Sequence, residues 1–243
     1  MSTNLISIDS RDRRNPNDTS SSFQVFFDDL LSEEEKIISI ESLIISKSYY
    51  AINEWNETFI INATPVTLTR GNYSASAFIA HLKVVLDATA IGTFSVTYST
   101  ITGKLSISIN AGTFTITSNT KNYNYLGMVK STTVTSVLTN WVSPGVIDLG
   151  STPYIDILVD VPMNSVNTTG INRNILARIP ANTTDFTTIF YSTSNFNFVS
   201  LLTTKFSSLR ISLVDVNNDL VDLNLLDWSM VLNVKSVTNK SLN

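Results

Sequence analysis

Short stretches of alternating polar and apolar residues dominate the chain and restrict most strongly the folds it can adopt. They are rich in β-branched and aromatic residues and stop at clusters of Asn, Gly, Pro or Ser, a pattern typical of half-buried β-strands. Nine or more strands at this spacing predict an antiparallel β-sandwich or barrel. The predicted strands are residues 23–28, 36–46, 57–62, 94–98, 104–109, 113–117, 154–161, 209–215 and 227–234.

Three turns between these stretches suggest how the strands connect. Residues 99–103 end in Gly103, which can supply the positive φ of a hairpin loop, and a second turn is expected at Asn110-Ala111-Gly112. Together they predict a three-stranded meander over residues 94–117. Asn217-Asn218 predicts a further hairpin turn, since the acidic residues around it lack the glycine and glutamate of a calcium loop.

One segment departs from the β pattern. Between residues 74 and 88 the apolar side chains recur at helical spacing, and Ser74 or Ser76 can cap the start. This predicts one short amphipathic helix that packs on an edge of the sandwich and closes a crossover. The Asn- and Thr-rich stretches 121–150 and 163–198 are expected to be long loops, where binding surfaces are commonly displayed.

Length and composition favour one compact domain. The chain has 243 residues, of which 43% are hydrophobic and only 15% charged, enough to build a single core. We expect an extended N-terminal arm over residues 1–22 and a β-sandwich domain over residues 23–243. No apolar run approaches the roughly 20 residues of a membrane-spanning helix. The few charges indicate a surface largely covered by neighbouring molecules.

The sequence offers little for catalysis. It contains one histidine, His81, on the predicted helix, and no cysteine. With one histidine and no cysteine, a zinc site of the usual ligand types cannot form, and a catalytic triad would have only His81 as its base. We therefore expect neither enzymatic activity nor a metal or other cofactor. The net charge of −4 and the pI near 4.9 argue against a general nucleic-acid binder.

Three arginines stand out in the N-terminal arm. Arg11, Arg13 and Arg14 lie in a segment with too little apolar content to form a core, so the arm is expected to be mobile in a free subunit. A guanidinium pairs with carboxylate or phosphate groups, so Arg11, Arg13 and Arg14 are candidate interaction residues, for which the family resemblance described below implies carboxylates of neighbouring subunits or packaged nucleic acid as partners.

Several short motifs point to a known family. They are IESLIISKSYYAIN at 40–53, LTRGNYS at 68–74 before the predicted helix, TGKL at 102–105 and SIDSRDR at 7–13. This sequence resembles the penton, or minor capsid, proteins of virophages, polinton-like viruses and related DNA viruses with double-jelly-roll capsids. The resemblance covers roughly residues 5–130, with Lys47 at a position where the family often has proline.

The resemblance implies a fold and a function. The fold would be all-β, a single upright jelly-roll antiparallel β-sandwich with one short crossover helix. Five copies would form a homopentamer at each five-fold vertex of an icosahedral virion, surrounded by the double-jelly-roll major capsid protein, after synthesis in the host cytoplasm. A closed ring of identical subunits needs one side of each subunit to meet the opposite side of the next.

A carbohydrate- or receptor-binding jelly roll, such as a lectin-like or fibre head domain, is the alternative. It would share the fold and the polar loops, but it needs an aromatic platform. The candidates for such a platform are Trp141 and the cluster Phe186, Phe190, Tyr191, Phe196 and Phe198.

Overall fold

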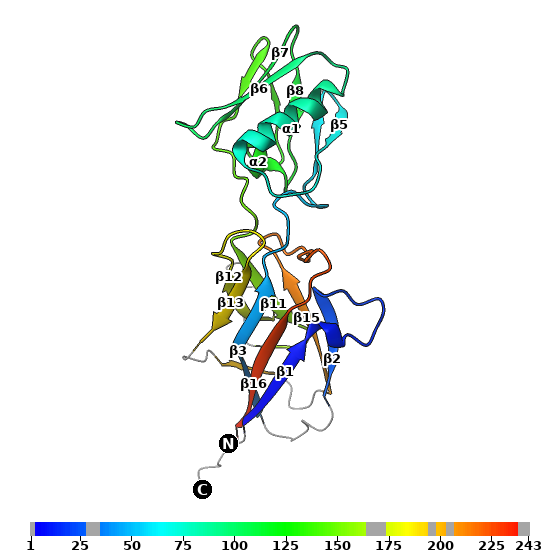
Figure 1. Ribbon diagram of the computed structural model, residues 1–243, viewed down its shortest axis with the longest axis vertical. Coiled ribbons are helices and arrows are strands. Elements are labelled where there is room, and N and C mark those ends of the chain that lie inside the picture. The colour runs from blue at the N-terminus through cyan, green and yellow to red at the C-terminus, as the bar shows by residue number, and fades with distance from the viewer. Residues whose placement is uncertain (1–2, 28–34, 164–173, 194–197, 203–206, 238–243) are drawn as a thin grey trace. The chain divides into compact units, whose positions relative to one another are not determined.

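The structure is a computed structural model that describes residues 3–27, 35–163, 174–193, 198–202 and 207–237 (Figure 1). Antiparallel sheets make up most of it, as predicted. The chain divides into two compact units, each with its own hydrophobic core. Unit 1 comprises Met1–Tyr49 and Thr152–Asn243, and unit 2 comprises Tyr50–Ser151.

Within its described residues, unit 1 holds nine strands, eight of which form two sheets of four. The first sheet has the order β1-β16-β3-β13 and the second β12-β11-β15-β2, while the two-residue β14 also pairs with β3. The strands are β1 Thr3–Asp9, β2 Ser22–Phe26, β3 Glu35–Ser46, β11 Tyr154–Val159, β12 Ile175–Pro180, β13 Thr188–Ser192, β14 Val199–Ser200, β15 Ser208–Val214 and β16 Ser229–Val237. A short 3-10 helix, η1, covers Ser10–Asp12.

This strand order is that of a jelly roll. Numbered along the chain without β14, the eight strands have the order 1-8-3-6 in one sheet and 2-7-4-5 in the other, so consecutive strands alternate between sheets except at the fourth and fifth. Figure 1 shows β3, β16 and β1 side by side in the first sheet. The jelly-roll prediction is therefore confirmed for unit 1.

The core of unit 1 follows from the alternation within each strand. In β15 Leu209, Ile211 and Leu213 are buried and the residues between them are half-buried, and the last residue, Val214, is also buried. Successive side chains of a strand point to opposite faces, so every second residue reaches the space between the two sheets. Phe23 and Trp228 also lie in this core, with ring centroids 5.7 Å apart.

Unit 2 is a smaller β-structure inserted between β3 and β11. Its sheets have the orders β10-β7-β6 and β5-β4-β8-β9. Its core is separate and includes Phe59, Phe78 and Leu105. Its elements are β4 Thr58–Ile61, β5 Thr64–Thr67, α1 Ala75–Asp87, β6 Phe94–Tyr98, β7 Leu105–Ile109, β8 Thr115–Thr117, α2 Tyr123–Leu126, β9 Thr133–Thr135 and β10 Asn140–Val142.

The predicted helix is present as α1. Ser74 caps it, with its Oγ accepting a hydrogen bond from the Ala77 N–H at 3.3 Å, and the buried face presents Phe78, Leu82 and Leu86. The helix connects β5 of one sheet of unit 2 to β6 of the other, so it belongs to the inserted unit and packs on β6. Neither described α-helix is long and apolar enough to cross a membrane.

The domain boundaries differ from the expectation of an arm over 1–22 and one domain over 23–243. Residues 3–9 form β1, paired with β16 from Thr3↔Lys235 to Asp9↔Ser229. Ile8 is buried because β1 alternates polar and apolar residues and so covers part of the core. The segment Tyr50–Ser151 forms a second unit because its apolar side chains pack with one another.

The meander prediction is wrong for its third strand. The hairpin between β6 and β7 forms as expected, with Gly103 at φ 67°. However, β7 pairs on its other side with β10, and β8 pairs with β4 and β9. After residues 110–112 the chain crosses to the other sheet, where Phe114 packs edge-on against Phe94 at 5.7 Å and both rings are buried. Because the chain crosses between the sheets here, β7 and β8 both direct apolar residues into the core of unit 2.

Candidate assembly surface

The three N-terminal arginines differ in the hydrogen bonds and ion pairs that they form within the chain. Arg11 donates two hydrogen bonds to Asp9, from Nε at 2.9 Å and from a terminal nitrogen at 2.5 Å. Arg13 donates to Asp227 at 2.6 Å and to the Ser10 carbonyl. The Arg14 guanidinium lies 5.5 Å from the ring centroid of Phe26 and forms no ion pair with a described residue. Arg14 is therefore the one of these three arginines whose charge is not paired with a described carboxylate.

These ion pairs fix the end of β1. Arg11 holds the pKa of the Asp9 carboxyl at about 2, because its hydrogen bonds favour the charged form. Arg13, helped by the Ser10 hydroxyl, lowers the pKa of Asp227 in the same way. The buried Ser10 hydroxyl donates to Asp227 at 2.7 Å and its backbone N–H donates to the Trp228 carbonyl at 2.9 Å. The sequence 7–13 thus anchors β1 within its own chain.

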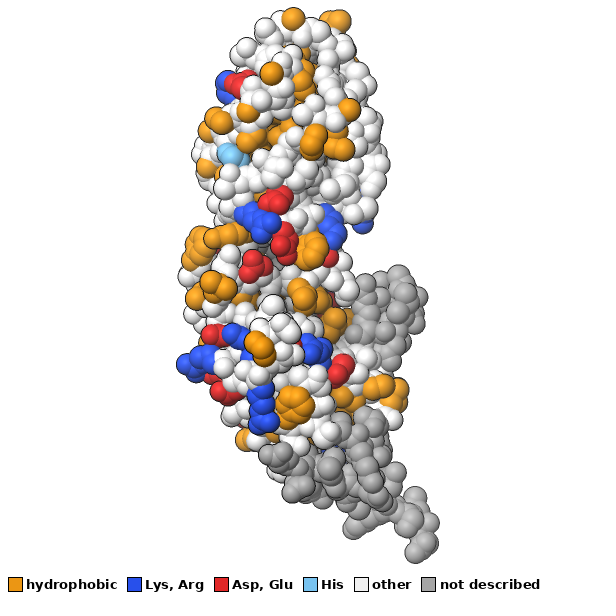
Figure 2. All heavy atoms as spheres, turned by 90° about the vertical axis from the view of Figure 1, so that its right-hand side faces the viewer, with side chains coloured by type: hydrophobic (Ala, Val, Ile, Leu, Met, Phe, Trp, Pro, Cys, Tyr) orange, Lys and Arg blue, Asp and Glu red, His pale blue; other side chains and the backbone are white. Residues whose placement is uncertain are grey.

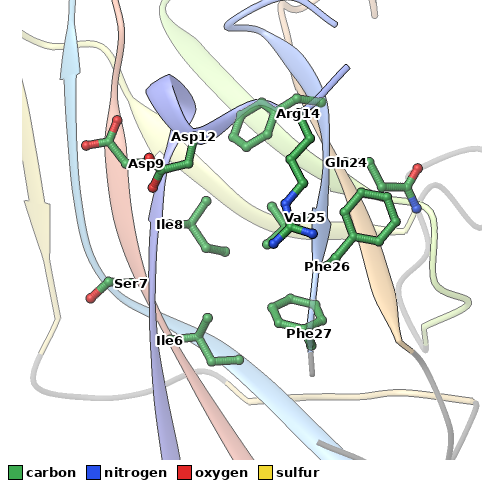
Figure 3. A pocket seen from close by; sticks show the side chains of 11 residues that line it. Ile6, Ser7, Ile8, Asp9, Asp12, Arg14, Gln24, Val25, Phe26 and Phe27 are labelled. Carbon is green, nitrogen blue, oxygen red and sulfur yellow. The ribbon is translucent and has the colours of Figure 1, made fainter. Parts of the chain in front are cut away.

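A groove of about 220 Å³ lies between β1 and β2. These two strands are the edges of the two sheets of unit 1, on the same side of the sandwich. Figure 3 shows Ile8 of β1 and Val25 of β2 pointing into the space between the strands, with the Arg14 side chain extending into it. Asp12 lies at the rim and Phe26 on the outer side of β2. The groove therefore has an apolar interior and a charged rim.

The β1 edge of the groove presents backbone groups that point away from its partner strand β16. The bond from the Ser10 N–H to the Trp228 carbonyl sets the hydrogen-bond phase of β1, so the backbones of Leu5 and Ser7 point away from β16. β1 and β2 contain no proline or basic residue, and Asp9 is their one acidic residue. Uncovered edge strands usually carry such residues to prevent pairing with other chains. This side of the sandwich therefore has the character of a contact surface.

The opposite side of unit 1 is bounded by β12 and β13 and displays aromatic rings. Phe190 lies directly opposite Ile44 in the register of β13 and β3, and both side chains are exposed, Phe190 to 67%. Phe186 is 68% exposed and has a φ of 62°, which is costly for a bulky residue. Its backbone N–H donates to the Lys47 carbonyl at 2.8 Å, and Lys47 forms an ion pair with Asp185 at 3.3 Å.

The β12-β11-β15-β2 sheet carries paired charges. On the β12-β11-β15-β2 sheet, Arg178 donates two hydrogen bonds to the buried Asp156, at 2.8 and 2.9 Å, and stacks on Tyr154 at 3.7 Å. Arg210 of β15 pairs with Asp18 at 3.2 Å. Figure 2, which views the molecule from the right-hand side of Figure 1, shows basic side chains lying beside acidic ones. These charges are largely matched within the chain.

The other candidate residues occupy different positions. Trp141 is buried in unit 2 at the register position of Ile107, so it forms no platform. Phe198 lies 4.1 Å from the Lys235 ammonium, Tyr191 packs on the core of unit 1, and Phe196 lies outside the described residues. Of the proposed aromatic cluster, Phe186, which precedes β13, and Phe190, which lies within it, are exposed.

His81 and the acidic turn have local structural roles. The Nε2 of His81 accepts a hydrogen bond from the Thr69 N–H at 2.9 Å, and the ring stacks on Tyr73 at 5.5 Å. The predicted turn is confirmed: the Asp215 carboxylate accepts from the N–H groups of Asn217 and Asp219, and Asn218 has a φ of 66°. No group of three potential metal-ligating side chains occurs in the described part of the chain.

Comparisons with known proteins give a likeness at the level of the fold. No protein family model and no curated protein sequence matches the chain. Among solved structures, the chain is similar to the crystal structure of the mavirus penton protein, with a TM-score of 0.52 and 10% sequence identity. The match covers 98% of this chain and 100% of that one. The whole chain, with its inserted unit, therefore has a penton-like capsid fold.

Proposed function

We propose that this chain is a structural penton, or minor capsid, protein that forms pentamers at the five-fold vertices of an icosahedral virus capsid. The likeness to the mavirus penton protein over nearly the full length of both chains is the observation that carries this proposal. A jelly roll with an inserted second unit is a specific architecture, and the motifs at 40–53 and 68–74 independently resemble this family.

The surface chemistry supports an assembly role. One surface of unit 1 has the outer backbone groups of the edge strand β1 beside an apolar groove, and another, around the opposite edge strand β13, displays two phenylalanine rings. A protein that closes a ring needs two such unlike surfaces. The partners would be four further copies and the double-jelly-roll major capsid protein, in a virion assembled from proteins made in the host cytoplasm. No catalytic step or cofactor is part of this role.

The proposed function is compatible with contacts from the N-terminal arginines to a partner, made mainly by Arg14. Arg11 and Arg13 are paired with Asp9 and Asp227, so contacts to a neighbouring subunit or to packaged DNA would fall mainly to Arg14. A bidentate arginine–carboxylate pair across a subunit contact is the interaction we expect.

Assembly of the purified protein tests the proposed function. Native mass spectrometry should show a five-copy species, and electron microscopy should show rings. Coexpression with the major capsid protein of the same virus should give shells that contain this chain at their vertices. A protein that stays monomeric at every concentration and is absent from those shells is not a penton.

The exposed rings of Phe186 and Phe190 favour a carbohydrate-binding jelly roll as the second candidate function. Aromatic rings on an exposed strand offer a stacking surface for a sugar face. Glycan-array binding by the isolated protein that is lost in Phe190→Ala would support this candidate. Absence of glycan binding together with five-copy assembly would reject it.

A further inference from the structure

The groove between β1 and β2 and the exposed rings of Phe186 and Phe190 are complementary in shape and charge. The groove between β1 and β2 is concave, with Ile8 and Val25 inside it. The opposite side presents Phe186 and Phe190, each about two-thirds exposed. Apolar rings of this size bury well in apolar grooves and often anchor protein interfaces.

Charge complementarity also links the two sides. The Arg14 guanidinium lies beside the groove, 5.5 Å from the ring centroid of Phe26, and forms no ion pair with a described residue. On the opposite side, Asp185 directly precedes Phe186, and its side chain is partly exposed beside Lys47. An arginine that stacks on one aromatic ring can take a second ring and a carboxylate from a partner.

The groove and the two rings lie on different surfaces of unit 1, since β13 is the edge strand opposite to β1 and Phe190 is exposed beside Ile44 on the outward face of that sheet. β1 and β2 end their sheets on one side, and β13 and β12 end the same sheets on the other. A contact between two different surfaces is heterologous, and repeated copies of such a contact close into a ring when the rotation allows it. A contact between two β1 edges would be isologous and would stop at a dimer.

We propose that the occupant of the β1–β2 groove is a second copy of this chain, which inserts Phe186 and Phe190 while its Asp185 approaches Arg14. This inference rests on the proposed function and names the surfaces by which successive subunits of the ring meet. The backbone groups of β1 that point away from β16 add hydrogen-bonding capacity at the same contact.

Substitutions on each surface test the contact. Phe26→Asp removes the ring beside Arg14 and gives Arg14 a carboxylate within its own chain, and Phe190→Asp removes an inserted ring, so each should weaken the five-copy species by about tenfold or more. Val84→Asp is the matched control, since Val84 is an exposed apolar residue of unit 2, and it should assemble like the parent. Thermal melting identifies any variant that fails to fold. Both phenylalanines are at least half exposed, so the folds should be retained.

Cross-linking decides the case independently of stability. The chain has no cysteine, so Asp12→Cys at the groove rim and Thr188→Cys beside Phe190 give a defined pair for a bismaleimide. The double variant should form a ladder up to five copies, while each single variant should stay uncrosslinked. Dimers from Asp12→Cys alone would overturn the heterologous contact.

The remaining outcomes separate this inference from the proposed function. A five-copy species that gives no ladder with the double variant, and that tolerates Phe26→Asp, would place the ring contact elsewhere and overturn this inference alone. A protein that remains monomeric and never enters shells would overturn both.

Discussion

Bulky residues in the left-handed backbone region recur at exposed positions of this chain. Leu138 has a φ of 53° and Leu225 a φ of 66°, and both side chains are largely exposed, as is that of Phe186. This conformation costs roughly 1–2 kcal/mol for residues with a Cβ. Burial of these side chains within the subunit does not offset the cost, so each position is a candidate contact in an assembly.

Two glycines with positive φ allow the cost of backbone strain alone to be compared with the cost of strain plus a steric clash. Gly103 and Gly112 have φ values of 67° and 80°, but a Cβ at Gly103 would lie 2.6 Å from Cγ1 of Val146, whereas one at Gly112 meets open space. Gly112→Ala should cost about 1 kcal/mol of unfolding free energy, and Gly103→Ala should cost more. Adding Val146→Ala should recover part of that difference. Equal losses at the two glycines, measured by urea unfolding, would contradict the assigned clash.

The Arg13–Asp227 pair gives a pH-dependent prediction. The pKa of Asp227 lies below its usual value of 3.8 because Arg13 and Ser10 donate to the carboxylate. A lowered pKa in the folded state stabilises the protein above pH 3.8, and this contribution is lost as the pH falls through the folded-state value. Asp227→Asn should therefore lower the unfolding free energy at pH 7 by about 1 kcal/mol.

Urea unfolding at neutral and acidic pH measures this effect. The difference between Asp227→Asn and the parent should shrink as the pH falls below 3.8, because the parent carboxylate then becomes protonated. Asp12→Asn is the control, since Asp12 is exposed and has no hydrogen bond to a described residue. A pH-independent difference would mean that the pair does not stabilise the end of β1.

At the scale of elements, β1 is the strand whose role changes most between sequence and structure. It pairs with β16 over its full length and buries Ile8. Ile8→Ala should reduce the unfolding free energy by about 2–5 kcal/mol, as for other buried aliphatic residues, and deletion of residues 1–14 should lower the melting temperature markedly. The exposed neighbour Ser7→Ala should change little. An unchanged melting temperature after the deletion would instead support the expectation of a mobile N-terminal arm.

The helix α1 has its own matched pair of substitutions. Leu82 is fully buried in the core of unit 2. Leu82→Asp places a carboxylate in that core and should lower the unfolding free energy by several kcal/mol. Val84, on the exposed face two residues away, should tolerate Asp. Circular dichroism melting curves compare the two variants. Melting of Leu82→Asp like the parent would contradict the helix orientation.

Elements with strong local patterns were predictable from the sequence. All nine predicted strands and the helix are present, because alternation and spacing are local properties of a few residues. β12 and β13 were expected to be loop because they are short and lie in Asn- and Thr-rich sequence, although Ile175–Pro180 buries Leu176 and Ile179. The alternation of residues 5–8 also signals β1, but its partner β16 lies more than 220 residues away.

The order of strands could not be predicted in the same way. Whether β8 pairs with β7 or β4 depends on contacts between distant segments, and the turn sequence 110–112 suits either path. The groove is equally non-local, since it needs the edges of both sheets. The arginines were identified from sequence, and the Arg11–Asp9 pair is local, but the pairing of Arg13 with Asp227 depends on where the end of β1 meets the segment before β16 in the fold.

At the scale of the whole molecule, the two units divide the apolar residues without overlap. Every buried residue of one core lies in Met1–Tyr49 or Thr152–Asn243, and every buried residue of the other lies in Tyr50–Ser151. A unit with its own core has the main requirement for independent folding. The chain thus combines a jelly roll that presents the two proposed ring surfaces with an inserted unit that contributes neither.

This division predicts that residues 50–151 fold alone and that unit 1 assembles without them. The isolated segment should melt cooperatively, since its core of Phe59, Phe78 and Leu105 is internal to it. Unit 1, with a short Gly/Ser linker joining Tyr49 to Thr152, should keep its fold and still form the five-copy species in native mass spectrometry. The full chain carrying Phe190→Asp is the comparison, because it keeps unit 2 and loses one proposed contact. Assembly that disappears with unit 2 but survives Phe190→Asp would move the ring contacts to the inserted unit.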